Sequence, residues 1–197
     1  YMSNLKFLKD RINDYNSNLF INELFAASKK LGILEEKINS YKFDNILIPL
    51  LNKKEAISSM NIEGTQTTIS DVLEDEINED RERRNEKNYI EASNHTKALH
   101  YGAIQLNQNN FNHTLIKELH KIMLNNIVEK NKEKTLGKYK EKDNYIVNSV
   151  GTIVFNPPSF NETKKYMDEL LDFMNDSTID INPLIKTAII HSQFEDR

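Results

Sequence analysis

Residues 54–70 constrain the fold more than any other part of the chain, because they combine a helix end, a reversal and a helix start. Ser59 and Glu63 lie four residues apart, so on a helix they share one face. Gly64 follows directly, and glycine is the residue that most readily ends a helix in the left-handed conformation. The next helix then opens with a Thr-x-x-Asp capping pattern at Thr68. The segment therefore predicts two helices joined by a tight turn, the first ending on a carboxylate.

Helical spacing of apolar residues extends over most of the remaining chain. Glycine and proline are scarce, with five and four among 197 residues, which favours helices joined by short loops. We expect Gly32 to break or bend the first helix and residues 41–49 to form a connector. The predicted helices cover residues 4–38, 50–63, 69–78, 86–107, 113–130 and 160–175, and a last helix begins at Pro183.

Two of these helices carry a predicted buried stripe. The helix over residues 50–63 is expected to bury Leu50, Leu51, Ile57 and Ile62. In the helix over residues 86–107, spacings of three and four predict one buried line, which consists of Tyr89, Ala92, Thr96, Leu99, Ala103 and Leu106.

One part of the chain has strand character instead. Residues 145–147 and 152–155 are rich in β-branched and aromatic side chains, and the intervening turn contains Gly151. We therefore predict an all-α helical bundle with one β-hairpin. The domain boundary is placed near residue 80, with an N-terminal helical region over residues 1–80 and a core over residues 81–197.

Composition excludes several classes of function. The net charge of −4 and pI of about 5.8 do not indicate a nucleic-acid partner. The chain has no cysteine, hence no disulfide or thiolate metal site, which suits a reducing compartment, and we expect a cytoplasmic protein. No apolar run predicts a membrane span. The five histidines include no pair at the i, i+4 spacing of a helical metal site, so no metal ligand is assigned.

The residues around the predicted reversal carry a family resemblance. The run Glu55-Ala56 to Gly64-Thr65, with Ser-x-x-x-Glu-Gly inside it, resembles the inhibitory helix of Fic-domain proteins, which transfer AMP from ATP to protein hydroxyl groups. Later segments are similar to the Fic core in the same order along the chain. They are residues 88–92, 115–120, 137–140, 150–158 and 183–195.

This resemblance implies an adenylyltransferase that uses ATP and Mg²⁺ and modifies a Ser, Thr or Tyr hydroxyl of a target protein. Glu63 would pair with an arginine of the family's catalytic motif and block productive seating of the ATP γ-phosphate. Ser59, one turn earlier, would orient that carboxylate, and Gly64 would end the helix. Glu63, Ser59 and Gly64 are therefore the expected inhibitory residues.

The hairpin resembles the flap that holds a target polypeptide over the Fic active site. The residues expected near the nucleotide or the target are Val150, Gly151, Thr152 and Ile153. An extended target segment would pair with the flap as an added strand, because main-chain pairing tolerates many sequences. The expected partner is thus a protein substrate, and association with further copies of the chain stays open.

The sequence departs from the family at its last residues. In Fic proteins the last helix leads into Ile-His-Pro-Phe-x-x-Gly-Asn-Gly-Arg, whereas here Asp196-Arg197 are the final residues. No catalytic residue is therefore assigned in this chain, and Arg197 is not given the role of the motif's arginine. We expect residues 1–197 alone to have little or no transferase activity.

Two alternatives remain open at this stage. The chain could be a non-catalytic helical interaction module that uses the hairpin as a strand-pairing surface. It could also belong to a protein that removes AMP from targets, with Glu63 positioning the attacking water.

Overall fold

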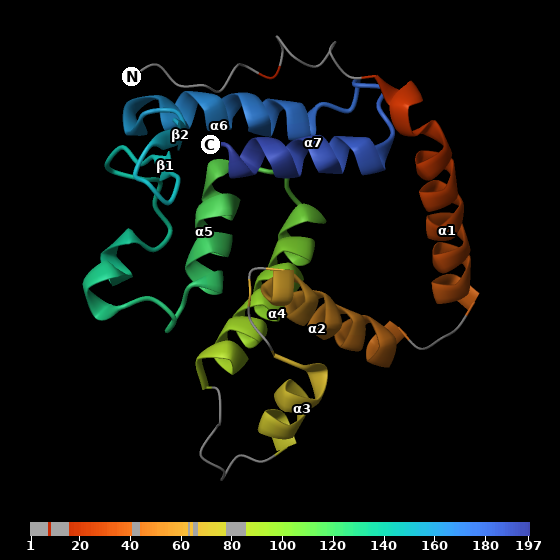
Figure 1. Cartoon of the computed structure of the whole chain (residues 1–197). Coiled ribbons are helices and arrows are strands. Elements are labelled where there is room, and N and C mark those ends of the chain that lie inside the picture. Colours follow the sequence, from red (N-terminus) through yellow and green to blue (C-terminus); the bar gives the residue numbers. More distant parts are fainter. Residues whose placement is uncertain (1–7, 9–15, 41–43, 63, 65–66, 78–85) are drawn as a thin grey trace. The chain divides into compact units, whose positions relative to one another are not determined.

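The computed structural model describes residues 8, 16–40, 44–62, 64, 67–77 and 86–197, and within them the chain is mainly helical with one two-stranded sheet (Figure 1). The predicted all-α fold with a single hairpin is confirmed. The elements are η3 (Ser17–Phe20), α1 (Ile21–Ser40), α2 (Asp44–Ile62), α3 (Ile69–Ile77), α4 (Glu86–Leu106), α5 (His113–Met123), η4 (Lys130–Thr135), β1 (Ile146–Val147), β2 (Ile153–Phe155), α6 (Phe160–Asn175) and α7 (Pro183–Glu195).

The chain divides into two compact units. The first, here called the hairpin unit, comprises Tyr1–Glu36, Asn110–His113 and Lys138–Arg197. The second, here called the reversal unit, comprises Lys37–Asn109 and Thr114–Gly137. The boundary predicted near residue 80 falls outside the described residues and stays a prediction.

The helices α6 and α7 lie side by side and support the hairpin unit. Both begin at the residue where the sequence predicted them. Glu162 accepts hydrogen bonds from the backbone N–H and the hydroxyl of Ser159, which closes the first turn of α6. Asn182 accepts from the N–H of Leu184 and precedes Pro183, the first residue of α7. On α6 the buried residues include Thr163, Met167 and Leu170.

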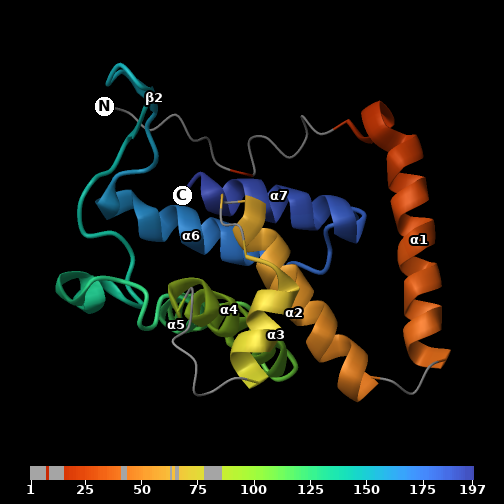
Figure 2. The same cartoon turned by 60° about the horizontal axis from the view of Figure 1, so that its bottom comes forward.

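The core of the reversal unit forms where α2 packs against α4, with α3 in contact with both (Figure 2). Its buried apolar side chains are Ile57, Met60, Val72 and Ala92, with Ile69 and Tyr89 packed partly buried against them.

The start and the buried face of α2 differ from prediction. The helix begins at Asp44 and contains Pro49, which was predicted to end a connector. Proline has no N–H to donate, so at Pro49 the helix loses the hydrogen bond that would reach back one turn. Ile57 is buried as predicted, but the inward face continues through Ala56 and Met60. The predicted core residues Leu50, Leu51 and Ile62 are exposed instead.

The buried line of α4 is also rotated from the predicted one. Ala92 is buried as predicted, whereas Leu99, Ala103 and Leu106 are exposed. From Asn94 to the end of the helix the buried residues are Asn94, Ala98 and Gly102, at intervals of four. A Cβ added at Gly102 would lie 3.5 Å from a methyl group of Leu119, so these small residues accommodate α5 closely. The large apolar residues of the predicted line therefore lie mostly outside the buried side of the helix.

The helix α5 is shorter than predicted because a polar side chain and a left-handed residue end it. It stops at Met123 rather than at residue 130. The amide of Asn94 donates to the carbonyl oxygens of Met123 at 3.2 Å and Asn125 at 2.7 Å, which satisfies carbonyls that lack helical partners. Asn126 then adopts φ 60°, and asparagine tolerates this conformation better than most residues.

Gly32 does not interrupt α1, which runs continuously from Ile21 to Ser40. In the part of the chain that the structure describes, no atom outside its own helix backbone and neighbours lies within 4 Å of an added Cβ at this position. We therefore expect Gly32→Ala to stabilise the protein by about 0.5–1 kcal/mol, because alanine loses less backbone entropy in a helix. Urea unfolding measures this change, and a loss of stability would contradict it.

Candidate functional site

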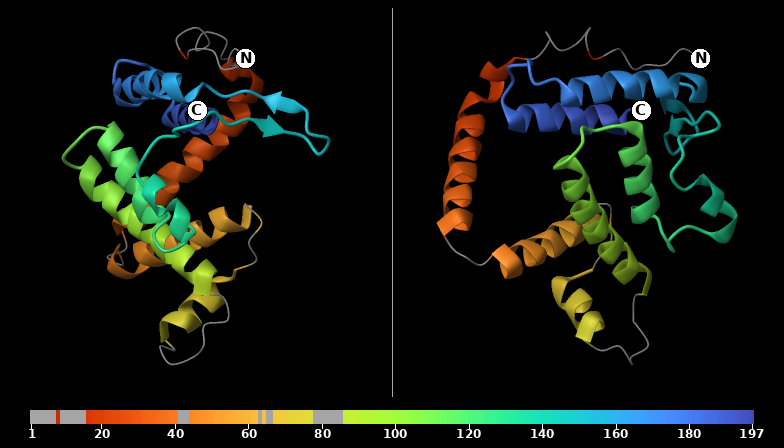
Figure 3. Two further views of the ribbon diagram at one scale, coloured as in Figure 1. Left: turned by 90° about the vertical axis from the view of Figure 1, so that its left-hand side faces the viewer. Right: turned by 180° about the vertical axis from the view of Figure 1, so that it is seen from behind.

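The predicted flap is an antiparallel hairpin that projects from α6 and α7 (Figure 3). Its register places Ile146 opposite Phe155 and Val147 opposite Ile153. Val150 at the tip is 81% exposed, and most strand side chains are exposed as well. Within the described residues this sheet has two strands, so the outer edge of each leaves main-chain groups that can pair with an added strand.

The turn of the hairpin depends on Asn148. Its side-chain oxygen accepts hydrogen bonds from the N–H groups of Val150 at 3.1 Å and Thr152 at 2.9 Å. Gly151 has φ 81°, which favours glycine over residues with a Cβ. Gly151 was predicted as the turn residue, whereas the part played by Asn148 was not, although asparagine at a turn start is a recognisable signal.

The base of the hairpin is anchored, in contrast to its tip. Asp143, just before β1, accepts a 2.8 Å hydrogen bond from the N–H of Phe160, the first residue of α6. Asn156, Pro157 and Pro158 follow β2 and are buried. The residues predicted to meet a target therefore lie on an exposed tip with a fixed base.

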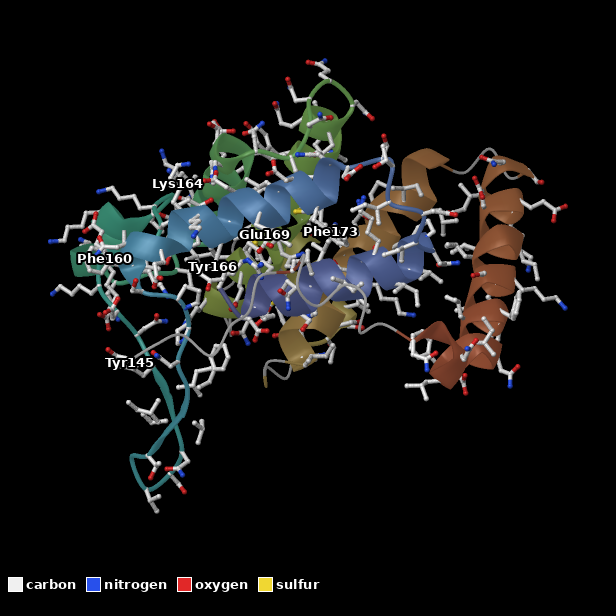
Figure 4. The ribbon with its side chains drawn as sticks, turned by 90° about the horizontal axis from the view of Figure 1, so that it is seen from above. Tyr145, Phe160, Lys164, Tyr166, Glu169 and Phe173 are labelled. Carbon is white, nitrogen blue, oxygen red and sulfur yellow. The ribbon has the colours of Figure 1, made fainter. Side chains whose placement is uncertain are left out.

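A buried guanidinium joins α6 to the end of α7. The Arg197 side chain is 1% exposed, and its Nε donates to the carbonyl oxygen of Tyr166 at 2.8 Å. Its other nitrogens contact the carbonyl oxygen and side chain of Gln193 and the carboxylate of Glu169 at 3.3 Å. Figure 4 shows Tyr166 and Glu169 on the side of α6 next to α7. Burial lowers the pKa of Arg197, which Glu169 partly offsets.

A second polar cluster in the hairpin unit joins three segments that sequence reasoning did not connect. His113 contacts the hydroxyl of Tyr139 through Nδ1 at 2.7 Å and the carboxylate of Asp168 through Nε2 at 2.5 Å. Lys164, one turn before Asp168, pairs with the same carboxylate at 2.9 Å. The carboxylate requires a donor at Nε2, so in the neutral imidazole Nδ1 accepts the Tyr139 proton. Burial, followed by the charge of Asp168, raises the pKa of Tyr139.

This cluster gives stability a dependence on acid pH. The hydrogen bond from His113, followed by the one from Lys164, lowers the pKa of Asp168. A carboxyl whose pKa is lower in the folded state stabilises the fold above its ordinary pKa, and that contribution is lost as the pH falls through the folded value. We expect Asp168→Asn to flatten the fall in stability below pH about 4, as measured by urea unfolding at several pH values. The same flattening in Asp172→Asn, at an exposed position of α6, would contradict this assignment.

The predicted inhibitory residues belong to the reversal unit. Ser59 is half-buried near the end of α2, and Gly64 has φ 101° with its N–H donating to the carbonyl oxygen of Asn61 at 3.2 Å. Glu63 lies outside the described residues. The predicted cap of α3 is present, because Asp71 accepts from the N–H of Thr68 at 2.8 Å.

The positive φ of Gly64 yields a stability prediction. Among the described residues, no atom outside its chain neighbours lies within 4 Å of a Cβ added at Gly64. The left-handed conformation alone disfavours alanine, and we expect Gly64→Ala to cost about 1–2 kcal/mol. Gly32→Ala is the matched control with the opposite expected sign. Equal effects of the two substitutions on urea unfolding would contradict the assignment.

The predicted site residues belong to two different units. The hairpin residues belong to the hairpin unit, and Ser59 and Gly64 belong to the reversal unit. Within the described residues, no three His, Asp or Glu side chains gather closely enough to hold a metal ion. Among the helices of that same part of the chain, none is long and apolar enough to cross a membrane.

Two of the remaining histidines contact other groups of the protein, and a third is exposed. His120 accepts a hydrogen bond at Nδ1 from the N–H of Gly137 at 3.0 Å, as expected for a structural histidine. His95 lies 3.5 Å from the carboxylate of Glu55. His191 is exposed.

The fold and the anchored hairpin define a helical domain with an exposed two-stranded flap, and comparison with known proteins gives its family. The family model described as "Fic/DOC family N-terminal" matches residues 21–103, and the one described as "Fic/DOC family" matches residues 110–196. The chain belongs to the Fic/DOC family. None of the curated proteins compared with it matches.

Solved structures show the same fold. One of them is the crystal structure of a Fic family protein from Desulfovibrio desulfuricans G20, with a TM-score of 0.62 and 16% sequence identity. The match covers 100% of this chain and 54% of that protein. The chain thus spans about half the length of the relative whose fold it shares.

Proposed function

We propose that this chain is part of a protein adenylyltransferase and carries its inhibitory reversal and its target-binding hairpin. The target hydroxyl oxygen would bond to the α-phosphorus of ATP, and pyrophosphate would leave with the displaced electron pair. The observation that carries this proposal is Ser59-x-x-x-Glu63-Gly64 inside the segment that matches the Fic/DOC N-terminal family. A cytoplasmic location, where ATP is available, is part of the proposal.

The proposed role of Glu63 is electrostatic. In the full-length protein its carboxylate would pair with an arginine of the family's Gly-Asn-Gly-Arg segment and keep that arginine from the ATP γ-phosphate. A carboxylate–guanidinium pair is stronger than a neutral hydrogen bond, so one side chain can hold the site in an inhibited state. Ser59, half-buried one turn earlier, would orient the carboxylate.

The proposed role of the hairpin is to hold the target. The exposed residues Val150, Gly151, Thr152 and Ile153 would contact the target or the nucleotide, and the open strand edges would pair with an extended segment of the target. The anchored base supports this role, because it fixes where the added strand would lie.

The Mg²⁺ that this reaction implies finds no site among the described residues, where no suitable acidic cluster exists. We therefore assign no residue of this part of the chain to the ion and no catalytic step to it. The proposed roles of the described residues are to bind and orient the target and to help keep the site inhibited.

The group that is transferred tests the proposed reaction. The full-length protein and its Glu63→Gly variant would be incubated with ATP that is labelled at either the α- or the γ-phosphate, and incorporation into protein would be measured. Label from the α-phosphate alone is the expected result. Label from the γ-phosphate, or no label from either in the variant, would overturn the proposal.

A non-catalytic interaction module is the second candidate, and the exposure of the hairpin favours it. Val150 and the strand side chains are exposed, and strand pairing by main-chain groups needs no nucleotide. Capture of an extended peptide by residues 1–197 without ATP, together with absence of α-phosphate transfer by the full-length protein, would support this candidate over the enzyme.

A further inference from the structure

The exposed side chains of the hairpin share one chemical character. Residues 144–158 contain no Asp, Glu, Lys or Arg, although 28% of the whole chain is charged. Ile146, Val147 and Val154 are each more than half exposed, and Tyr145, just before β1, is exposed as well (Figure 4). Large apolar side chains that gather on an exposed segment commonly mark a surface that a partner covers. The hairpin therefore presents an apolar, uncharged surface.

Both faces of the hairpin carry such side chains. Val147 lies opposite Ile153 in the register, so these two share one face, and Ile146 and Phe155 share the other. A strand added beside the hairpin places its side chains next to those of the edge strand, on each face in turn. Apolar side chains would therefore find apolar neighbours at successive positions of the added strand, and a charged side chain would find no ion pair there.

The charges at the base of the hairpin supply little electrostatic attraction for a target. Residues 138–143 contain three lysines and two acidic residues, so their charges nearly cancel. Lys138 pairs with Glu141 at 3.6 Å, and the carboxylate of Asp143 accepts the N–H of Phe160. Exposed pairs of this kind contribute little on their own. Neither an acidic nor a basic segment is thus favoured by the base.

The register favours β1 as the strand that receives a partner. Between its two paired positions β2 has one extra residue, Val154, and such an irregularity bends a strand and disturbs pairing along its outer edge. Pro157 and Pro158 follow β2 closely and have no N–H to donate. Unpaired edges are commonly blocked by lysine or proline, and residues 144–156 contain neither. The outer edge of β1 therefore lacks the features that prevent pairing.

We propose that the outer edge of β1 receives an extended target segment that is uncharged and carries apolar, β-branched or aromatic side chains beside Ile146 and Val147. This inference rests on the proposed function where the bound segment belongs to the substrate of AMP transfer, whereas the preference itself concerns binding alone. It makes Ile146 and Val147 specificity-determining residues, in addition to the residues predicted at the tip.

Binding of matched peptides to the full-length protein, without ATP, tests this preference. The peptides share one blocked host sequence of alternating Ser and Thr, and their four central positions are all Val, all Ser, all Glu or all Lys. Fluorescence anisotropy of a dye at one end of each peptide measures the affinity. Because cross-strand pairs each contribute modestly, the Val peptide should bind about threefold to thirtyfold more tightly than the Ser peptide. The Glu and Lys peptides should bind no better than the Ser peptide.

Three variants test the same preference from the side of the protein. Val147→Lys should reverse it, so that the Glu peptide binds more tightly than the Val peptide. Val147→Thr keeps the β-branched shape that suits a strand and should reduce the preference without reversing it. Leu31→Lys adds a charge at an exposed position of α1 and should leave the order of the affinities unchanged.

Equal affinities for the four peptides, or no detectable binding by any of them, would overturn the inference. A dimer of the full-length protein that Val147→Lys dissociates would also overturn it, because a second copy would then occupy the edge. AMP transfer by the Glu63→Gly variant to the same peptides, each with one added Tyr, separates the inference from the proposed function. Preference for Val in both binding and transfer supports both. Preference for Val in binding, with no AMP transfer to any peptide or protein, supports the inference and overturns the proposed reaction.

Discussion

Replacing Glu63 by glycine is expected to raise the initial rate of AMP transfer by the full-length protein about 10- to 100-fold. The estimate follows from a hydrogen bond to a charged group, which contributes about 1.5–3 kcal/mol, with each 1.4 kcal/mol equal to a factor of ten. If the carboxylate holds an arginine away from ATP, its removal returns that free energy to the productive state. Rates of incorporation from ATP labelled at the α-phosphate measure the effect.

Two controls make this prediction specific to the charge of Glu63. Glu63→Gln keeps the length of the side chain but removes the charge, and should give most of the increase. Glu35→Gln removes an exposed carboxylate on α1 and should leave the rate unchanged. An unchanged rate in Glu63→Gly would contradict autoinhibition. Loss of AMP removal in that variant would instead favour a role of Glu63 in positioning water.

Truncating Leu170 is expected to have the largest effect on stability. This side chain on α6 has no exposed surface, and it lies in the helix pair that supports the hairpin. Leu170→Ala should lower the free energy of unfolding by about 3–5 kcal/mol, because it removes buried apolar surface and leaves a cavity. Urea unfolding followed by circular dichroism measures the loss.

The matched control for Leu170 lies on the hairpin tip of the same unit. Val150 is 81% exposed, so Val150→Ala should change the free energy of unfolding by no more than about 0.5 kcal/mol. Similar losses in the two variants would contradict the placement of Leu170 in the core.

The elements that could be predicted from sequence are those with local signals at both ends. Ser159 with Glu162 and Asn182 with Pro183 fixed the starts of α6 and α7, because capping depends on residues within one turn. The hairpin was predicted for the same reason, since Gly151 and the flanking β-branched residues lie within one short segment.

The elements that were misplaced depend on contacts from elsewhere in the chain. The end of α5 at Met123 is set partly by Asn94, which lies on α4. The buried side of α4 is set by the approach of Leu119 to Gly102, and a pattern of large apolar residues does not report where small residues allow close packing.

The residues of the candidate site likewise divide into those that local signals predict and those that depend on contacts from elsewhere in the chain. Gly64 and the Thr68–Asp71 cap follow local rules and were predicted. The hydrogen bond from Asn88 to the hydroxyl of Thr67 and the contact of His113 with Asp168 join residues that are far apart in sequence, so no local pattern indicated them.

The central claim is that this chain regulates the transfer of AMP to a protein hydroxyl. Mass spectrometry of the full-length Glu63→Gly variant, after incubation with ATP and Mg²⁺, tests it most directly. The account predicts a peptide that carries AMP on a Ser, Thr or Tyr hydroxyl, at much higher occupancy than in the unaltered protein. Peptides that are unmodified, or that carry phosphate alone, would contradict it.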